Sequence, residues 1–223
     1  DSMADDAFMS LQMIADNQEK VEVRHLRVGR NCMDNFADFL SNQLSKAEIK
    51  CEGETIKIPD NILKDASHIL VTTMWLEHTY SSGYLLAKTL KSKFNGKVFV
   101  LSSVMFQDVT SLSLGMAKSK INPSDSDYYM FKNIRWDRKA TSDKLKSLVE
   151  GNEAIHFLDK ESFFCSLNQE KCQIFDSNGR PFIYDSAHLT VLGMGRYGPY
   201  LIEKLSPDFF ANTEQNYYKK ILG

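Results

Sequence analysis

Short apolar runs of the β type alternate along this chain with segments of helical periodicity, and this alternation constrains the fold more than any other feature. Strands are predicted at residues 21–27, 68–74, 97–102 and 154–158. Helices are predicted at residues 4–16, 34–45, 83–93, 137–150 and 190–205. Strands that alternate with helices indicate a doubly wound α/β fold, in which a mainly parallel sheet lies between two helical layers.

Such a fold binds its ligands outside the carboxyl ends of the parallel strands. Gly29, Trp75 and Ser103 follow three of the predicted strands, so we expect the site near them. No internal repeat, low-complexity tract or linker divides the 223 residues. We therefore expect one domain over residues 1–223.

The charge balance disfavours one large class of partners. The chain has 27 Lys and Arg against 29 Asp and Glu, a formal charge of −2, so nothing draws it to a polyphosphate backbone and no nucleic acid partner is expected. No apolar stretch approaches the roughly 20 residues of a membrane-spanning helix, and the first residues lack the pattern of a signal peptide. We expect a soluble chain, either mature or excised from a longer one.

The four cysteines, Cys32, Cys51, Cys165 and Cys172, fall in two local pairs. Their spacing is not the doubled C-x-x-C of a zinc site, and no histidine stands beside them at ligand spacing, so no metal is expected. As disulfides, each pair would close a short loop and would indicate an oxidising compartment. Four buried free thiols in a cytosolic protein explain the same spacing equally well.

Two long segments are too polar to be simple connections. Residues 103–136, with the run N-P-S-D at 122–125, predict a lid or acceptor surface over one end of the sheet. Residues 161–184 carry the second cysteine pair and the turn signal S-N-G-R at 177–180. This segment predicts a stapled hairpin that leads into Asp185.

Common motifs of α/β enzymes are absent or out of place. Residues 193–198 match G-x-G-x-x-G, but they follow no predicted strand and leave no room for a βαβ unit, which argues against a dinucleotide site. The chain has no G-x-S-x-G, no G-x-x-x-x-G-K-[ST] and no H-E-x-x-H. These absences exclude ordinary α/β-hydrolases, P-loop enzymes and zincins.

Asp185 and His188 stand three residues apart, just before a predicted helix. In a tight turn the carboxylate can accept the imidazole Nδ1–H, which leaves Nε2 to take a proton from a serine hydroxyl. A capping aspartate with an incidental histidine is the alternative. At the other end of the chain, Ser2 is a tag remnant or an N-cap in an S-x-x-D capping box with Asp5.

Taken together, these residues resemble a known superfamily. D-S at the start and D-x-x-H near the end, with Ser2, Asp185 and His188 in that order, resemble the SGNH (GDSL-like) hydrolases. The tail is similar to the SGNH domain of membrane-bound acyltransferase-3 proteins that O-acetylate bacterial surface glycans; the matching residues are Phe164-Cys165, Cys172, Gly179, residues 183–190 and Gly193. The strand that ends in Trp75 is also similar to that subgroup.

The resemblance implies a three-layer α/β/α sandwich with a flavodoxin-like sheet. It also implies a position on the periplasmic or extracellular face of a bacterial membrane, where the cysteines pair as disulfides. The implied partners are an acyl donor, a glycan acceptor and a membrane-bound acyltransferase-3 domain in the same polypeptide. The family's first strand, with the glycine of G-D-S, is expected upstream of residue 1.

The implied reaction transfers an acyl (acetyl) group to hydroxyls of a surface polysaccharide such as O-antigen, lipopolysaccharide or peptidoglycan. Ser2, Asp185 and His188 would form the catalytic triad and an acyl-serine intermediate, and the N–H groups of Ser2 and Gly29 would hold the oxyanion. Trp75 would stack on a sugar ring or pack in the core. No metal or organic cofactor is needed.

Residues 71–80 lack the Asn that donates to the oxyanion in the superfamily's G-x-N-D block. Two alternatives therefore stand beside acyl transfer. One is a carbohydrate O-acetylesterase of the same fold, and the other is a non-catalytic glycan-binding module.

Overall fold

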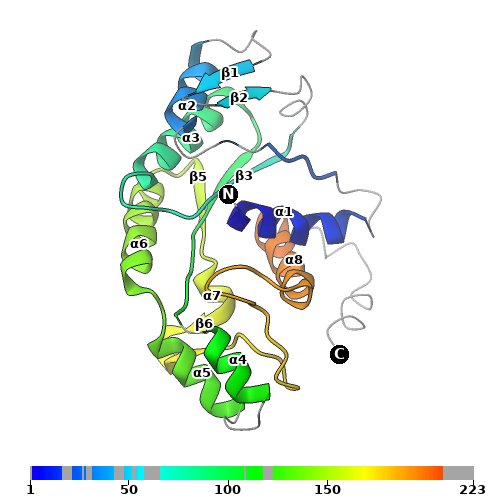
Figure 1. Ribbon diagram of the computed structural model, residues 1–223. Coiled ribbons are helices and arrows are strands. Elements are labelled where there is room, and N and C mark those ends of the chain that lie inside the picture. The colour runs from blue at the N-terminus through cyan, green and yellow to red at the C-terminus, as the bar shows by residue number, and fades with distance from the viewer. Residues whose placement is uncertain are drawn as a thin grey trace. The chain divides into compact units, whose positions relative to one another are not determined.

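A computed structural model describes residues 2–16, 22–26, 28, 32–42, 48–51, 54–57, 66–107, 109–117 and 123–207 (Figure 1). The chain forms two compact units. Unit 1 comprises Asp1, Arg24–Ser103 and Ala140–Leu158, and unit 2 comprises Ser2–Val23, Val104–Lys139 and Asp159–Gly223. That both belong to one domain stays a prediction.

Unit 1 contains a parallel sheet of three strands in the order β3-β4-β5 (Figure 1). The strands are β3 (His68–Thr72), β4 (Lys97–Leu101) and β5 (Ile155–Leu158). β4 is the central strand, and its last four residues are buried because both faces of a parallel sheet pack against other elements. The prediction of an α/β fold with a parallel sheet is confirmed, and these strands lie where the apolar runs predicted them.

One face of this sheet packs against helices α2 (Met33–Asn42), α3 (Tyr80–Lys93) and α6 (Trp136–Glu150). Val98 and Val100 of β4 point to this face, since alternate residues of a strand share a face. There they meet Leu86 and Leu90 of α3 and Leu145 of α6. The spacings of three and four residues in the helices are those of one apolar stripe, which explains why sequence periodicity located them.

The strand predicted at residues 21–27 is not found. Residues 22–26 are described without strand structure, and residues 21 and 27 lie outside the described part. A strand is defined by its pairing, and no described strand pairs with this run. The antiparallel hairpin of β1 (Glu48–Cys51) and β2 (Glu54–Lys57) was not predicted, because charged residues interrupt its apolar positions.

In unit 2, helix α1 (Ser2–Ala15) packs against α8 (Val191–Leu205), close to the other end of the sequence (Figure 1). The two backbones approach closely at Gly198, where a Cβ atom would collide with the carbonyl oxygen of Ser10. A Cβ at Gly193 would likewise collide with the backbone of Phe182. Two glycines of the G-x-G-x-x-G match thus allow close packing, and the motif lies within a helix.

The segment 103–136, predicted as a lid or acceptor surface, forms two helices in its described part, α4 (Val109–Ala117) and α5 (Pro123–Lys132). Pro123 begins α5, because proline is well suited to a first helical turn. Unit 2 then continues after β5 with α7 (Glu161–Phe164), β6 (Cys165–Ser166), the short 3₁₀ helix η2 (Leu167–Gln169) and β7 (Lys171–Cys172).

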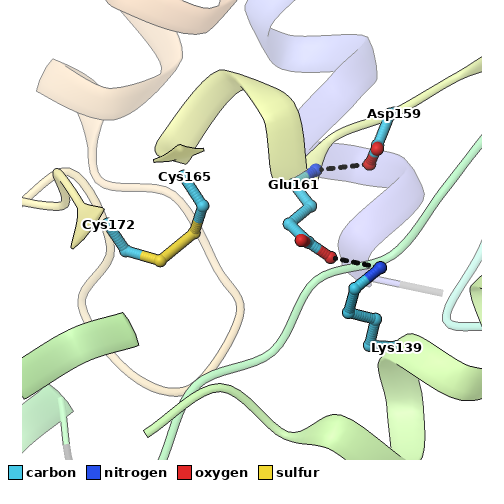
Figure 2. The surroundings of a disulfide bond; sticks show 5 residues. All are labelled: Lys139, Asp159, Glu161, Cys165 and Cys172. Atoms are coloured by element: carbon cyan, nitrogen blue, oxygen red, sulfur yellow. Dashed lines mark hydrogen bonds and ion pairs between the residues drawn. A yellow bond between two sulfur atoms is a disulfide. The ribbon is translucent and has the colours of Figure 1, made fainter. Parts of the chain in front are cut away.

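β6 and β7 form a hairpin whose turn is η2, and the predicted turn at 177–180 is flanked by a separate antiparallel bridge between Phe175 and Pro181. Cys165 and Cys172 face each other in the antiparallel register and form a disulfide, which Figure 2 shows at the end of α7. Cys32 is also disulfide-bonded, whereas the side chain of its predicted partner Cys51 lies outside the described residues. Of the helices described, none has the length and apolar character to cross a membrane.

Candidate active site

Asp185 and His188 lie in a tight turn of unit 2, and their side chains contact each other. The His188 Nδ1–H donates to Asp185 Oδ2 over 2.6 Å. Asp185 Oδ1 accepts the backbone N–H groups of Ala187 (2.8 Å) and His188 (2.9 Å). One carboxylate therefore shapes the turn and orients the imidazole. This leaves Nε2 as the nitrogen that can exchange a proton with another group.

The same contacts keep Asp185 ionised. Burial raises the pKa of the Asp185 carboxyl, but the N–H groups of His188 and Ala187 and the imidazole outweigh it, so the pKa lies below its usual value. An ionised carboxylate is the form that accepts the Nδ1–H and stabilises an imidazolium.

Backbone bonds on both sides fix this turn. The N–H of Tyr184 donates to the His188 carbonyl (3.0 Å), and the N–H of Phe106 donates to the Ser186 carbonyl (2.8 Å). Thr190 caps α8 by accepting the Gly193 N–H at its Oγ1 (3.0 Å). The ring of Tyr184, an exposed residue, stacks on the His188 ring with 5.7 Å between centroids.

Helix α1 is bonded directly to this turn. Asp6 Oδ2 accepts the backbone N–H of Leu189, the residue after His188, over 3.0 Å. Ser2 is the first residue of α1, and its side chain lies outside the described part. It precedes Asp6 by four residues, about one helical turn, which puts the two positions on the same face of α1.

Lys160 is buried beside these groups, with 2% of its surface exposed. Its Nζ lies 5.8 Å from the centroid of the Tyr197 ring on α8. Burial lowers the pKa of Lys160 to about 8, although the charges of Asp6 and Asp185 act in the opposite direction. Burial also raises the pKa of Asp6, and Lys160 and the Leu189 N–H offset only part of that effect.

The pKa of Lys160 makes the stability of the fold dependent on pH. Because this pKa is about 8 in the folded chain and 10.5 ordinarily, the unfolded chain binds more protons between these values. The free energy of unfolding therefore rises with pH, by about 2 kcal/mol from pH 7 to 9.5. Urea denaturation of wild type and Lys160→Met at each pH measures the contribution of Lys160 to this pH dependence. A stability difference that stays constant with pH would contradict the lowered pKa of Lys160.

The other predicted site residues belong to unit 1. Gly29 lies outside the described residues. Trp75 is completely buried, its indole N–H donates to the Leu101 carbonyl (2.6 Å), and its ring packs against Gly83. No face of the ring is open to a sugar, so we assign Trp75 to the core. Ser103 is also buried, and its backbone N–H donates to Ser142 Oγ (3.3 Å).

Sequence reasoning missed Asp6 and Lys160. Lys160 follows β5 by two residues, so the rule that sites lie after parallel strands would have found it. Asp6 carries a weaker signal, its helical spacing from Ser2. Among the described side chains, no three His, Cys, Asp or Glu residues are grouped as metal ligands.

The described part of this site can orient a histidine and stabilise its protonated form. A family model described as "SGNH domain (fused to AT3 domains)" matches residues 60–203, more than half of the chain. This range includes Lys160, Asp185 and His188 and excludes Ser2, Asp6 and Gly29. No curated protein and no solved structure matches the chain.

Proposed function

Because the chain belongs to the family of SGNH domains that are fused to AT3 domains, we propose that it is a serine-dependent O-acyltransferase. It transfers an acyl group, acetyl in the simplest case, to hydroxyls of a bacterial surface polysaccharide. It acts on the periplasmic or extracellular face of the membrane, next to an acyltransferase-3 domain of the same polypeptide that delivers the acyl group.

The observation that carries this proposal is the 2.6 Å bond between His188 and Asp185. An imidazole held in one tautomer by an ionised carboxylate is the arrangement that activates a hydroxyl nucleophile. The side chain of His188 keeps 24% of its surface exposed, so a reacting group can reach it. The bond between Asp6 and Leu189 favours Ser2 as that group, because it holds α1 against the turn.

In the proposed reaction, His188 Nε2 takes the proton of Ser2 Oγ while Oγ attacks the acyl carbonyl. The backbone N–H of Ser2 is our proposed donor to the oxyanion, and Gly29 stays a predicted second donor. Collapse of the tetrahedral intermediate forms the acyl-serine, and His188 gives its proton to the leaving group. A sugar hydroxyl then gives its proton to His188 and attacks the acyl-serine carbonyl; the bond from the carbonyl carbon to Ser2 Oγ breaks, His188 returns the proton to Oγ, and the sugar ester leaves.

The same chemistry with water as acceptor gives an O-acetylesterase. The outcome depends on how well a sugar hydroxyl is positioned against water, since effective molarities of about 10⁵ M or more are possible for well-oriented groups. We favour transfer because the family is found fused to AT3 domains. A glycan-binding module without catalysis is the remaining alternative.

The first test compares wild type with Ser2→Ala, using p-nitrophenyl acetate as donor, with and without O-antigen polysaccharide. Acetylated sugar and free acetate are followed by mass. We expect acetylated sugar from wild type and at least a 10³-fold lower rate from Ser2→Ala, because the nucleophile is lost.

A suitable control is Ser147→Ala, which removes an exposed helical serine whose hydroxyl donates only to the Asp143 carbonyl among the bonds described. It should match wild type. Acetate release that depends on Ser2, without acetylated sugar, would instead favour the esterase. Equal rates for wild type and Ser2→Ala would exclude the proposed nucleophile.

A further inference from the structure

Two charged residues beside the proposed triad, Asp6 and Lys160, have no part in the proton transfers above. They are nevertheless buried in unit 2, with exposed fractions of 5% and 2%. Burying a charge is costly unless other groups balance it. Their burial therefore indicates a function that an apolar pair would not provide.

Asp6 links two parts of the site that are far apart in sequence. Its bond to the Leu189 N–H joins residues 183 positions apart. Leu189 also pairs with Ile183 across the turn, so the backbone on both sides of His188 is fixed. Asp6 thus fixes the position of the His188 imidazole relative to helix α1, which begins at Ser2.

Lys160 places a positive charge near two carboxylates that repel each other. The charge of Asp185 raises the pKa of Asp6, whereas Lys160 lowers it. The charged and titratable groups that act on Lys160 come from three elements: Asp6 from α1, Asp185 from the turn and Tyr197 from α8. The Lys160 ammonium offsets part of the effect of burial on the Asp6 carboxylate, and it is itself stabilised by the charges of Asp6 and Asp185.

We propose that Asp6 and Lys160 are positioning residues, Asp6 by fixing the His188 turn to α1 and Lys160 by balancing the charges of Asp6 and Asp185. This inference rests on the proposed function, since it concerns the same site. Neither side chain touches the reacting atoms in this proposal. Both act through the placement of His188 relative to Ser2.

Asp6→Ala and Asp6→Asn separate the bond from the charge. Alanine removes both, whereas the asparagine Oδ1 can still accept the Leu189 N–H. We expect kcat to fall about 100-fold in Asp6→Ala with little change in KM, because small displacements between reacting groups cost this much. Asp6→Asn should lose about 10-fold. Asp16→Asn is the control and should match wild type, because Asp16 is an exposed turn residue that follows α1.

Lys160→Met tests the charge, and the chain offers a matched control in Lys139→Met. Lys139 Nζ lies 3.4 Å from Glu161 Oε2, and both side chains are largely buried in the same unit (Figure 2). We expect about a 100-fold loss of kcat in Lys160→Met and less than a 3-fold loss in Lys139→Met. We expect wild-type activity to decline above about pH 8, where Lys160 loses its proton. Lys160→Arg should retain most activity and lack this decline, since arginine keeps its charge.

Hydrogen exchange of the Leu189 amide supplies a readout without substrate. Exchange should accelerate at least 10-fold in Asp6→Ala and stay slow in Asp6→Asn.

Wild-type turnover that depends on Ser2 but changes less than 3-fold in Asp6→Ala and Lys160→Met would overturn this inference and leave the proposed function intact. Absence of Ser2-dependent turnover would overturn the proposed function, and unchanged Leu189 exchange in Asp6→Ala would then overturn the link itself. If Lys160→Met fails to fold by circular dichroism, the pH profile of Lys160→Arg decides the role of the charge.

Discussion

Replacing His188 by alanine is expected to lower kcat at least about 10⁴-fold, because the base that Asp185 positions is lost. Asp185→Asn should lower it about as much. An asparagine side chain offers the imidazole an N–H where the carboxylate accepted one, so the tautomer that leaves Nε2 without a proton is no longer favoured. The measurement is the rate of acetyl transfer at saturating donor, in the assay described for Ser2→Ala.

Asp176 provides the matched control for Asp185. Its Oδ1 accepts the backbone N–H groups of Asn178 (3.0 Å) and Arg180 (2.7 Å), in the same type of turn, but its side chain partner is Arg180. Asp176→Asn should therefore retain activity within about 3-fold, as expected of a surface turn. If Asp185→Asn were no worse than Asp176→Asn, Asp185 would be a turn residue and not a triad member.

Trp75→Ala should lower the free energy of unfolding by about 3–5 kcal/mol, the usual cost of removing a large aromatic side chain from a core. Trp75 is fully buried and also loses its hydrogen bond to Leu101 in this variant. Urea denaturation followed by circular dichroism measures the change. Gly83, which the Trp75 ring contacts, has no side chain that could move into the cavity left by the substitution. We therefore expect a cost in the upper part of this range.

Trp136→Ala is the control for Trp75→Ala, since these are the two tryptophans of the chain. Trp136 is 48% exposed, and among the ring contacts described it meets Phe131 edge to face, at 5.7 Å between centroids. Its loss should cost no more than about 1.5 kcal/mol. Equal costs at the two positions would show that Trp75 is not a core residue.

The sequence predicts the parallel strands and the main helices because their apolar residues follow regular periods. It fails where structure depends on partners. Residues 22–26 belong to a run that predicts a strand but have no strand structure, and residues 103–136, predicted as a lid or acceptor surface, contain the helices α4 and α5.

The candidate site divides in the same way. The spacing of Asp185 and His188 reveals their hydrogen bond, since three residues of a tight turn bring the two side chains together. It does not reveal Lys160 or Asp6, because their importance lies in their burial and in a contact across 183 positions. The assignment of Ser2 as nucleophile and of Gly29 as oxyanion donor stays a prediction.

The bond between Asp6 and Leu189 also has a consequence for the order of events during synthesis. Helix α1 is made before α8, against which it packs, and most of the other described elements are made between the two. Until then, the apolar face of α1, with Ala7, Leu11 and Ile14, has no α8 to cover it. The apolar face of α1 therefore stays without this partner while the residues between α1 and α8 are synthesised. If the proposed function is correct, acyl transfer begins only after this late closure.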